Sequence, residues 1–445
     1  MQALHAAIAA LPFRATVFVH TGAAVPQSLT RAWAKRLVDD IDVRHTPTHL
    51  HTEGAAPWLN ADARIDTARL FFVGRNARAA VAAGRAALIP ERLSMIGSLY
   101  VKDPADVALI SVSPPDAHGR VSLGPSVDVT LDALRGGRLH KQVVIAQINR
   151  HLPVIGYSVH VRDIAAFVEL DEPLPALTTP RATLLPDNSD AALVGVARTV
   201  EAVIAHRVAA LVSDGACLQI GIGAIPEAVC AALCTHRHLG MHTEMLSDGL
   251  LRLIECGALD NARKEVDTGL SVGSFAIGMT ADAALEPSQR GAALYDFLDM
   301  NESVVLRAAS STNDPTTIAL NSRVTAINSA IEVDLSGQVC ADSAGSRILS
   351  GPGGQLDVAL GAAASKGGIF IIALPSTAAQ GTRSRIVATL TPGAGVVTPR
   401  SCVHYVVTEY GVAHLRGKTI PERAAALIAI AHPSLRAALS DYARK

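Results

Sequence analysis

The sequence is poor in aromatic residues and has almost no excess of charge. Aromatic side chains make up 4% of the 445 residues, whereas apolar residues make up 49%. Lys plus Arg number 39 and Asp plus Glu number 40. This balance argues against nucleic acid or a membrane surface as a partner. No uninterrupted apolar run reaches the roughly 18 residues that a membrane helix needs. At about 150 residues per domain, the length predicts two or three globular domains.

Targeting and cysteine-based signals are also scarce. The first twenty residues (MQALHAAIAALPFRATVFVH) lack a basic segment followed by a cleavable apolar one, so we expect a cytoplasmic protein. No C-x-x-C pair occurs, and no His or Asp pattern completes a metal site near Cys230 and Cys234. We expect reduced core thiols and no bound metal. The six cysteines are Cys217, Cys230, Cys234, Cys256, Cys340 and Cys402.

Apolar β-branched bursts alternate with Ala-rich stretches of helical period along most of the chain. Examples are TVFVH followed by SLTRAWAKRLVDDI, and RLFFVG followed by ARAAVAAGRAALI. This alternation predicts an α/β protein with mostly parallel sheets. Prolines and polar residues cluster over 171–188, where the periodicity stops. We therefore predict a linker there, with an N-terminal domain over 1–182 and a C-terminal domain over 183–445.

Three features recur in the same order in the two halves. A predicted strand leads into TGAAVP (21–26) in the first half and into GIGAIP (221–226) in the second. HTEG (51–54) then corresponds to HTEM (242–245), and the apolar segment 108–112 corresponds to 330–333. The recurrence predicts duplication of one βαβ-based unit. We expect two related α/β domains that face each other across a cleft.

The segment 221–226 is the sharpest local signal for chemistry. Its glycines allow backbone to approach a ligand closely, and N–H groups at the following helix start favour an anion or an oxyanion. The alternative is a tight strand-to-helix turn without function. The segment is not a G-x-G-x-x-G fingerprint, because Pro226 and Glu227 stand where the last glycine would come.

Glu244 follows this loop at the predicted carboxyl end of a short strand, where open α/β sheets bind their ligands. A carboxylate facing backbone donors there could act as a general base or as a nucleophile. It could equally cap a helix or pair with Arg252. Residues 351–354 (GPGG) form a second glycine-rich loop that could complete an oxyanion pocket or be a flexible loop. Glu332 is the second-choice carboxylate, although a salt-bridged strand residue is the simpler interpretation.

Several familiar catalytic signatures are absent. The chain has no G-x-S-x-G elbow, no G-x-x-x-x-G-K-[ST] loop and no H-E-x-x-H. His51 with Glu53, and His242 with Glu244, could be read as metal ligands, but neither pair has an evident third ligand. Metal-assisted hydrolysis is therefore a minor hypothesis.

Taken together, these segments resemble the acetyl-CoA hydrolase/transferase family, which includes 4-hydroxybutyrate, butyrate and itaconate CoA-transferases. The likeness covers nearly the whole chain. It is carried by SVSPPD (111–116), GIGAIP (221–226), GMHTEMLSD (240–248), NSAIEVDLSGQV (328–339), GPGGQ (351–355), IALPS (372–376), HYVVTEYG (404–411) and LRGK (415–418).

The resemblance implies two CoA-transferase domains and a ping-pong mechanism through a glutamyl-CoA thioester. It selects Glu244 as the catalytic residue over Glu332 and Glu53. It implies acyl-CoA and a small carboxylic acid as substrates, with no permanently bound cofactor, and we expect a homo-oligomer. It assigns CoA and oxyanion contacts to Gly221, Ile222, Gly223, Ala224, Ile225, Asn313, Ile331, Gly353 and Gly354.

One departure limits what the resemblance implies about the substrate. Relatives usually read Asp-Phe-x-Arg-Gly-Ala where this chain has DVALGA (357–362), so an aromatic residue and a cation are lost. Arg150 is the cation we expect to clamp the acceptor carboxylate, and its alternative is an ordinary surface charge. An acyl-CoA hydrolase and a catalytically silent CoA sensor are the competing functions.

Overall fold

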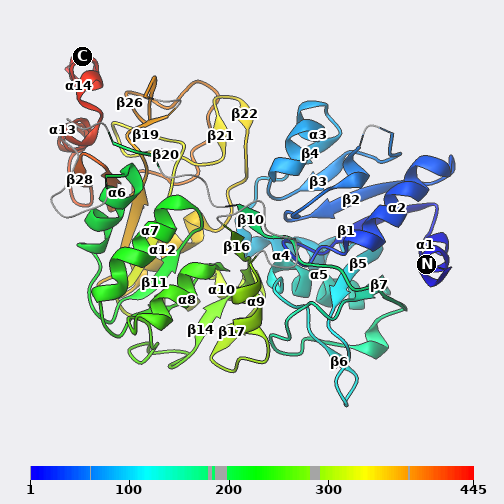
Figure 1. Ribbon diagram of the computed structural model, residues 1–445. Coiled ribbons are helices and arrows are strands. Elements are labelled where there is room, and N and C mark those ends of the chain that lie inside the picture. The colour runs from blue at the N-terminus through cyan, green and yellow to red at the C-terminus, as the bar shows by residue number, and fades with distance from the viewer. Residues whose placement is uncertain are drawn as a thin grey trace. The chain divides into compact units, whose positions relative to one another are not determined.

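Figure 1 shows the computed structural model of the chain, which describes residues 2–60, 62–178, 183–185, 198–280, 291–378 and 381–444. The chain forms two compact units. Unit 1 comprises Met1–Thr178 and Val272–Thr312, and unit 2 comprises Thr179–Ser271 and Asn313–Lys445. Residues 179–182 and 186–188 of the predicted linker lie outside the described residues. The linear division between 182 and 183 stays a prediction, and unit 1 also takes in a segment from much later in the chain.

Unit 1 is built on a seven-stranded sheet in which every neighbouring pair is parallel. β5 and β7 are almost wholly apolar, whereas β2 reads RHTPTH, and all six residues of the internal strand β5 are buried. Such runs are typical of parallel strands that are covered on both faces. In spatial order the strands are β4 (Ala86–Leu88), β3 (Ala68–Leu70), β2 (Arg44–His49), β1 (Arg14–Val19), β5 (Val107–Val112), β7 (Val143–Ile148) and β9 (Ala166–Glu169).

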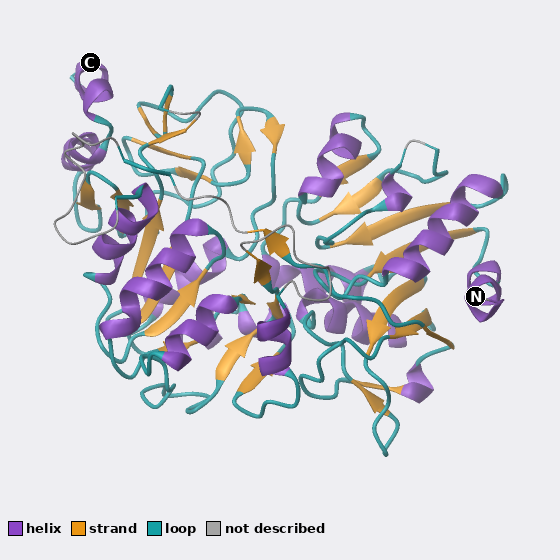
Figure 2. Ribbon diagram, in the orientation of Figure 1, coloured by secondary structure: helices purple, strands orange, loops and turns teal. Residues whose placement is uncertain are grey.

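Helices cover both faces of the sheet of unit 1: α2 lies on one face, and α4 and α5 lie on the other (Figures 1 and 2). The α-helices are α1 (Gln2–Ala9), α2 (Gln27–Asp39), α3 (Arg78–Ala82), α4 (Leu93–Lys102), α5 (Asp128–Arg138), α9 (Ala292–Leu298) and α10 (Ala309–Thr312). Short strands are β6 (Arg120–Val121), β8 (Val159–His160), β10 (Leu177–Thr178), β15 (Phe275–Ala276), β16 (Met279–Thr280) and β17 (Val304–Leu306). β14 (Ser271–Gly273) spans the boundary between the units.

Unit 2 has a six-stranded sheet that is parallel except for its last strand, β28. Its core includes the fully buried Phe370, Ile372 and Val406. In spatial order the strands are β12 (Gly240–Met241), β11 (Cys217–Ile220), β18 (Val324–Asn328), β23 (Ile369–Ala373), β27 (Tyr405–Thr408) and β28 (Gly411–His414).

A smaller three-stranded sheet in unit 2 joins β20, β19 and β26. The helices are α6 (Val200–Ala209), α7 (Ala224–Ala232), α8 (Asp248–Glu255), α11 (Pro315–Ala319), α12 (Gln355–Ala364), α13 (Ile420–Ile430) and α14 (Pro433–Ala443). The remaining strands are β13 (Met245–Leu246), β19 (Glu332–Asp334), β20 (Val339–Cys340), β21 (Ser343–Ala344), β22 (Arg347–Ile348), β24 (Thr377–Ala378), β25 (Arg383–Ser384) and β26 (Ile386–Val387).

The two sheets share one connectivity. In unit 1, β1 leads through α2 to β2 on one side, and β5 leads through α5 to β7 on the other. In unit 2, β11 leads through α7 to β12, and β18 leads through α12 to β23. The two connections of each unit run in opposite directions along the sheet, so the strand order reverses between β1 and β5 and between β11 and β18. Because such crossovers are right-handed, the helices of the two connections lie on opposite faces of the sheet. This agrees with the predicted duplication, and the predicted α/β class with mostly parallel sheets is confirmed.

One of the three matched features does not correspond in space. Residues 108–112 lie in the central strand β5, but the counterpart of β5 in unit 2 is β18. The segment 330–333 instead runs into β19 of the small sheet. Apolar β-branched patterns alone do not reveal which sheet a strand joins.

The six cysteines are free thiols. Cys217, Cys230 and Cys340 are buried, as expected of core thiols, whereas Cys234 and Cys402 are half-buried and Cys256 is exposed. No helix in the described ranges combines the length and the hydropathy needed to cross a bilayer.

Candidate active site

The loop after β11 lies where the strand order of unit 2 reverses. Open α/β sheets bind ligands at the carboxyl ends of strands beside such a reversal. Gly223 is the residue before α7 and has φ +109°, a conformation that strongly favours glycine. A Cβ at Gly223 would meet no atom within 4 Å, so backbone conformation, and not crowding, requires the glycine. The predicted site residues Gly221, Ile222, Gly223, Ala224 and Ile225 form this loop and the first turn of α7.

Thr243 fixes the segment that carries Glu244. Its hydroxyl donates to the backbone O of Ile220 (2.9 Å) and accepts from the N–H of the same residue (3.3 Å). The N–H of His242 extends the pairing by donating to Leu218 O (2.9 Å). Thr243 is thus attached to the last residue of β11, directly before the glycine loop. Glu244 comes next in the chain and is half-buried.

The Glu244 carboxylate contacts Asn313. The Asn313 Nδ2 donates to Glu244 Oε2 at 3.1 Å, and the Asn313 side chain is buried, at 1% exposure. Asp314 caps the helix α11 that follows, through its carboxylate and the N–H of Thr317 (3.0 Å), and so fixes the backbone beside Asn313. The Oδ1 of Asn313 is buried and has no hydrogen-bond partner among the described residues. This amide therefore uses its donor on Glu244 and leaves its acceptor unused.

Gly354 packs directly against this pair. A Cβ at Gly354 would overlap Glu244 Oε2 and Asn313 Nδ2, so any side chain there would displace them. Gly354 is also the residue before α12, and helix N-termini favour negative charge. Its neighbour Gly353 has φ +56° and faces open space. The carboxylate consequently lies at the start of α12.

Gln355 holds the start of α12 in place. Its Nε2 donates to Ser329 O (2.8 Å), and its Oε1 accepts from the Thr398 hydroxyl (2.9 Å). The loop after β18 and a distant loop are thereby connected to the helix that carries Gly354. Gln355, Thr398 and Thr243 were not among the predicted site residues. Thr243 could have been predicted, because the Thr of the His-Thr-Glu segment recurs in both halves.

Of the predicted site residues, Glu244, Asn313 and Gly354 are in contact, and the Gly221–Gly223 loop adjoins them through Ile220 and Thr243. Ile331 lies between β18 and β19, is half-buried and donates its N–H to Cys340 O (2.9 Å). Its role at the site stays a prediction, as do the assigned roles of the others.

Glu332 is held by partners of its own. It is 1% exposed, accepts from the N–H (2.6 Å) and hydroxyl (2.8 Å) of Thr391, and lies 3.3 Å from Arg383 Nη2. These contacts match the simpler interpretation of this carboxylate as a salt-bridged strand residue.

Arg150 belongs to unit 1 and is exposed. Its Nη1 lies 3.0 Å from Asp171 Oδ2, and its Nη2 lies 3.7 Å from Glu169 Oε2. The guanidinium already has two carboxylate neighbours, and its role as an acceptor clamp stays a prediction.

No three His, Cys, Asp or Glu side chains in the described ranges gather where they could hold a metal ion. In unit 1, His51 Nε2 lies 3.9 Å from Glu53 Oε1. Burial lowers the pKa of His51 to about 4 and raises the pKa of Glu53 to about 7, although Arg75 opposes the second shift. At pH 7 the His51 ring is therefore neutral, and the Glu53 carboxyl is about half ionised.

The raised pKa of Glu53 predicts a pH-dependent cost to stability. Unfolded, this carboxyl ionises near pH 4.3, whereas in the folded protein it ionises near pH 7. The loss of folding stability caused by ionising Glu53 is absent below about pH 4, grows between about pH 4 and pH 7 and is complete above pH 7. Glu53→Gln should raise the free energy of unfolding by roughly 1 to 3 kcal/mol at pH 8 and by little at pH 4. Denaturant titrations at both pH values measure this.

Glu169→Gln is the matched control, because the Glu169 side chain in the same unit is 72% exposed. It should change stability by less than about 0.5 kcal/mol at either pH. An equal gain for Glu53→Gln at pH 4 and pH 8 would contradict the assignment.

Comparison with known protein families matches both parts of the chain. The model of the acetyl-CoA hydrolase/transferase N-terminal domain matches residues 13–174, and that of the C-terminal domain matches residues 291–443.

Individual proteins match over most of the chain. The succinyl-CoA:acetate/propanoyl-CoA:succinate CoA transferase of Fasciola hepatica is 40% identical over 96% of this chain and 84% of its own length. The 4-hydroxybutyrate coenzyme A transferase of Clostridium kluyveri is 43% identical over 84% of this chain and 81% of its own. An acetyl-CoA hydrolase of Saccharomyces cerevisiae is 32% identical, over 51% of this chain and 40% of its own.

Among solved structures, RipA from Yersinia pestis is 32% identical and superposes with a TM-score of 0.85, covering 99% of this chain and 96% of its own. Two family models in the expected order, together with relatives above 30% identity over most of the chain, confirm the resemblance seen in the sequence. The chain belongs to the acetyl-CoA hydrolase/transferase family of enzymes.

Proposed function

We propose that the chain is a CoA-transferase that moves CoA between a short-chain acyl-CoA and a small carboxylate, with Glu244 as the catalytic nucleophile. The acids considered are acetate, butyrate, 4-hydroxybutyrate, succinate and itaconate. The proposal depends chiefly on one observation. The Glu244 carboxylate is held by Asn313 against Gly354, at the start of α12. The preceding residue, Thr243, is hydrogen-bonded to Ile220, directly before the glycine loop after β11.

The reaction has two half-reactions that mirror each other. A Glu244 oxygen attacks the acyl carbonyl carbon and the C–S bond breaks. CoA departs as the thiolate, and the acyl group is now joined to Glu244 as a mixed anhydride. The thiolate then attacks the Glu244 carbonyl carbon and expels the first acid as its carboxylate, which leaves a glutamyl-CoA thioester. In the second half-reaction the acceptor carboxylate attacks this thioester and displaces CoA thiolate, which gives a second mixed anhydride. The thiolate then attacks the acyl carbonyl carbon of the acceptor, which forms the new acyl-CoA and restores the Glu244 carboxylate. Each step exchanges one acyl–oxygen or acyl–sulfur bond for another at the same oxidation state, so the reaction needs no oxidant, reductant or metal ion.

The neighbours of Glu244 suit the charges that develop along this path. Each attack on a carbonyl places negative charge on an oxygen, which preorganised N–H donors stabilise. We assign this task to backbone N–H groups at the starts of α12 and α7, at Gly353–Gly354 and residues 221–225. Asn313 is a positioning residue in this account. Its Nδ2 keeps one carboxylate oxygen fixed, so that the other can attack. Ile331 is assigned to the CoA-binding surface.

A hydrolase is the second candidate, because acetyl-CoA hydrolases are among the relatives. In a hydrolase, water would attack the glutamyl thioester in place of a carboxylate. Release of free CoA from an acyl-CoA, measured with and without added acetate, butyrate or succinate, separates the two. Hydrolysis that is undiminished without any acceptor would favour the hydrolase.

Glu244→Gln tests the nucleophile with almost no change in size. The amide is a far poorer nucleophile, so transfer should fall by about 10³-fold or more while the thermal unfolding midpoint stays close to that of the wild type. Glu255→Gln, at the exposed end of α8, is the matched control and should transfer CoA normally. Transfer by Glu244→Gln within tenfold of the wild type would refute the assignment.

Gly354→Ala tests the packing around the carboxylate. The new methyl group would overlap Glu244 and Asn313, so the carboxylate must move and transfer should fall by at least about 10²-fold. Gly361→Ala is the control on the same helix. Its Cβ would lie 2.6 Å from Ile318, so it should lower the unfolding midpoint and leave transfer by the folded protein largely intact. Steady-state rates and thermal melts of both variants are compared. Full activity in Gly354→Ala would show that the contact is not required.

A further inference from the structure

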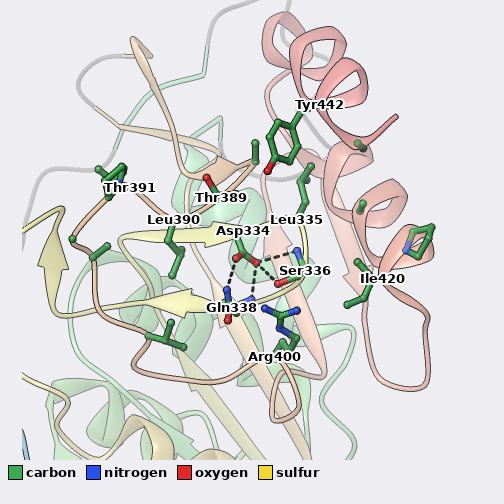
Figure 3. Close-up of a pocket in the computed structure, with 18 residues that line it drawn as sticks. Asp334, Leu335, Ser336, Gln338, Thr389, Leu390, Thr391, Arg400, Ile420 and Tyr442 are labelled. Atoms are coloured by element: carbon green, nitrogen blue, oxygen red, sulfur yellow. Dashed lines mark hydrogen bonds between the residues drawn. The ribbon is translucent and has the colours of Figure 1, made fainter. Parts of the chain in front are cut away.

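A second cavity of unit 2 involves none of the residues assigned to CoA transfer. Its volume is about 640 Å³. It lies between the turn 334–338, the loop 388–396, Arg400, the start of α13 and the end of α14 (Figure 3). We call this cavity the Arg400 pocket. Its volume falls within the range of small-molecule sites, about 300 to 1,000 Å³.

Much of the wall is apolar and open to solvent. Val396 and Ile420 are each 48% exposed and Tyr442 is 49% exposed, although large hydrophobic side chains are usually covered. Leu335 and Leu390 add to this surface, and Tyr442 extends from α14 with its hydroxyl end toward the turn 334–338 (Figure 3). Such a wall suits the hydrocarbon or aromatic part of a ligand.

The one acidic side chain of the lining is satisfied within its own turn. Asp334 Oδ1 accepts from the N–H (2.9 Å) and hydroxyl (2.6 Å) of Ser336 and from the N–H of Gln338 (3.0 Å). Its Oδ2 accepts from Gln338 Nε2 (2.6 Å). At 4% exposure this carboxylate faces its own turn and has little exposed surface toward a ligand.

Two cations lie beside this turn, and neither has an acidic partner among the residues that the structure describes. Arg400 is exposed and lines the pocket, and its guanidinium has no hydrogen bond or ion pair with any residue that the structure describes. Arg423 is buried and donates only to backbone, from Nη1 to Ser336 O (3.2 Å) and Arg400 O (2.7 Å) and from Nε to Lys418 O (3.3 Å). Burial, and then the charge of Arg400, lowers the pKa of Arg423. Two guanidinium groups and one carboxylate therefore leave an excess of positive charge around this turn.

We propose that the Arg400 pocket binds an amphipathic organic anion, with a carboxylate or phosphate at Arg400 and an apolar body against Val396, Ile420 and Tyr442. Guanidinium groups bind both anions in bidentate fashion, so the two sources share one recognition chemistry. The inference does not depend on the proposed function, because neither Glu244 nor its neighbours line this pocket.

The test uses the full chain and the fluorescent anion anilinonaphthalene sulfonate as the probe. Arg400→Ala should weaken probe binding about tenfold or more, since it removes a charge-assisted contact. Ile420→Glu, which adds an acid at the first residue of α13, should weaken it similarly. Arg416→Ala is the matched control, because it removes an exposed guanidinium of the same unit outside the pocket, and it should bind the probe as the wild type does.

Competition identifies the class of ligand. Displacement of the Arg400-dependent signal by hexanoate assigns the pocket to carboxylates, displacement by phenyl phosphate assigns it to phosphate esters, and either supports the proposal. Binding that is unchanged in Arg400→Ala would overturn it. Displacement of that signal by CoA would overturn it as a separate site. If the Arg400-dependent fluorescence is lost when the protein self-associates, the surface belongs to a contact with a second copy of the chain. That result would also overturn the proposal.

Discussion

The contact between the Glu244 carboxylate and Gly354 is the constraint on which the site depends. Only a residue without a side chain fits at the start of α12, because a Cβ would overlap Glu244 and Asn313. The same contact brings the carboxylate to the amino end of a helix, where negative charge is stabilised. The rest of unit 2 secures the partners: Thr243 attaches the Glu244 segment to β11, and Gln355 attaches α12 to Ser329 and Thr398. In the mechanism that we propose, a carboxylate so restrained is prepared for attack before substrate arrives.

The duplicated fold places a His-Thr-Glu segment at the end of corresponding strands in both units, yet the surroundings differ. Glu53 follows β2, and its burial raises its pKa to about 7. Glu244 follows β12 and receives a hydrogen bond from Asn313. A repeated motif therefore does not imply a repeated role, since charge and hydrogen bonding around each carboxylate decide its chemistry.

Local patterns predicted most of the fold and much of the site. Alternating apolar segments predicted parallel α/β sheets, and the glycine loops and Glu244 lie where strand ends and helix starts placed them. Contacts between distant parts of the chain were beyond such patterns. Asn313 is 69 residues from Glu244 in sequence, and its place was expected only from family resemblance. The inclusion of Val272–Thr312 in unit 1 and the pairing of β19 with β26 depend on tertiary packing, which periodicity does not report.

The central claim is that CoA becomes covalently attached to Glu244. The most direct measurement adds an acyl-CoA without an acceptor acid, treats the protein with borohydride and locates the modified residue by mass spectrometry of its peptides. A glutamyl thioester is reduced to a primary alcohol, whereas a free carboxylate is not. The account predicts one modified residue, Glu244, and no modification when acyl-CoA is omitted. An unmodified protein that still transfers CoA, or modification at another glutamate, would contradict it.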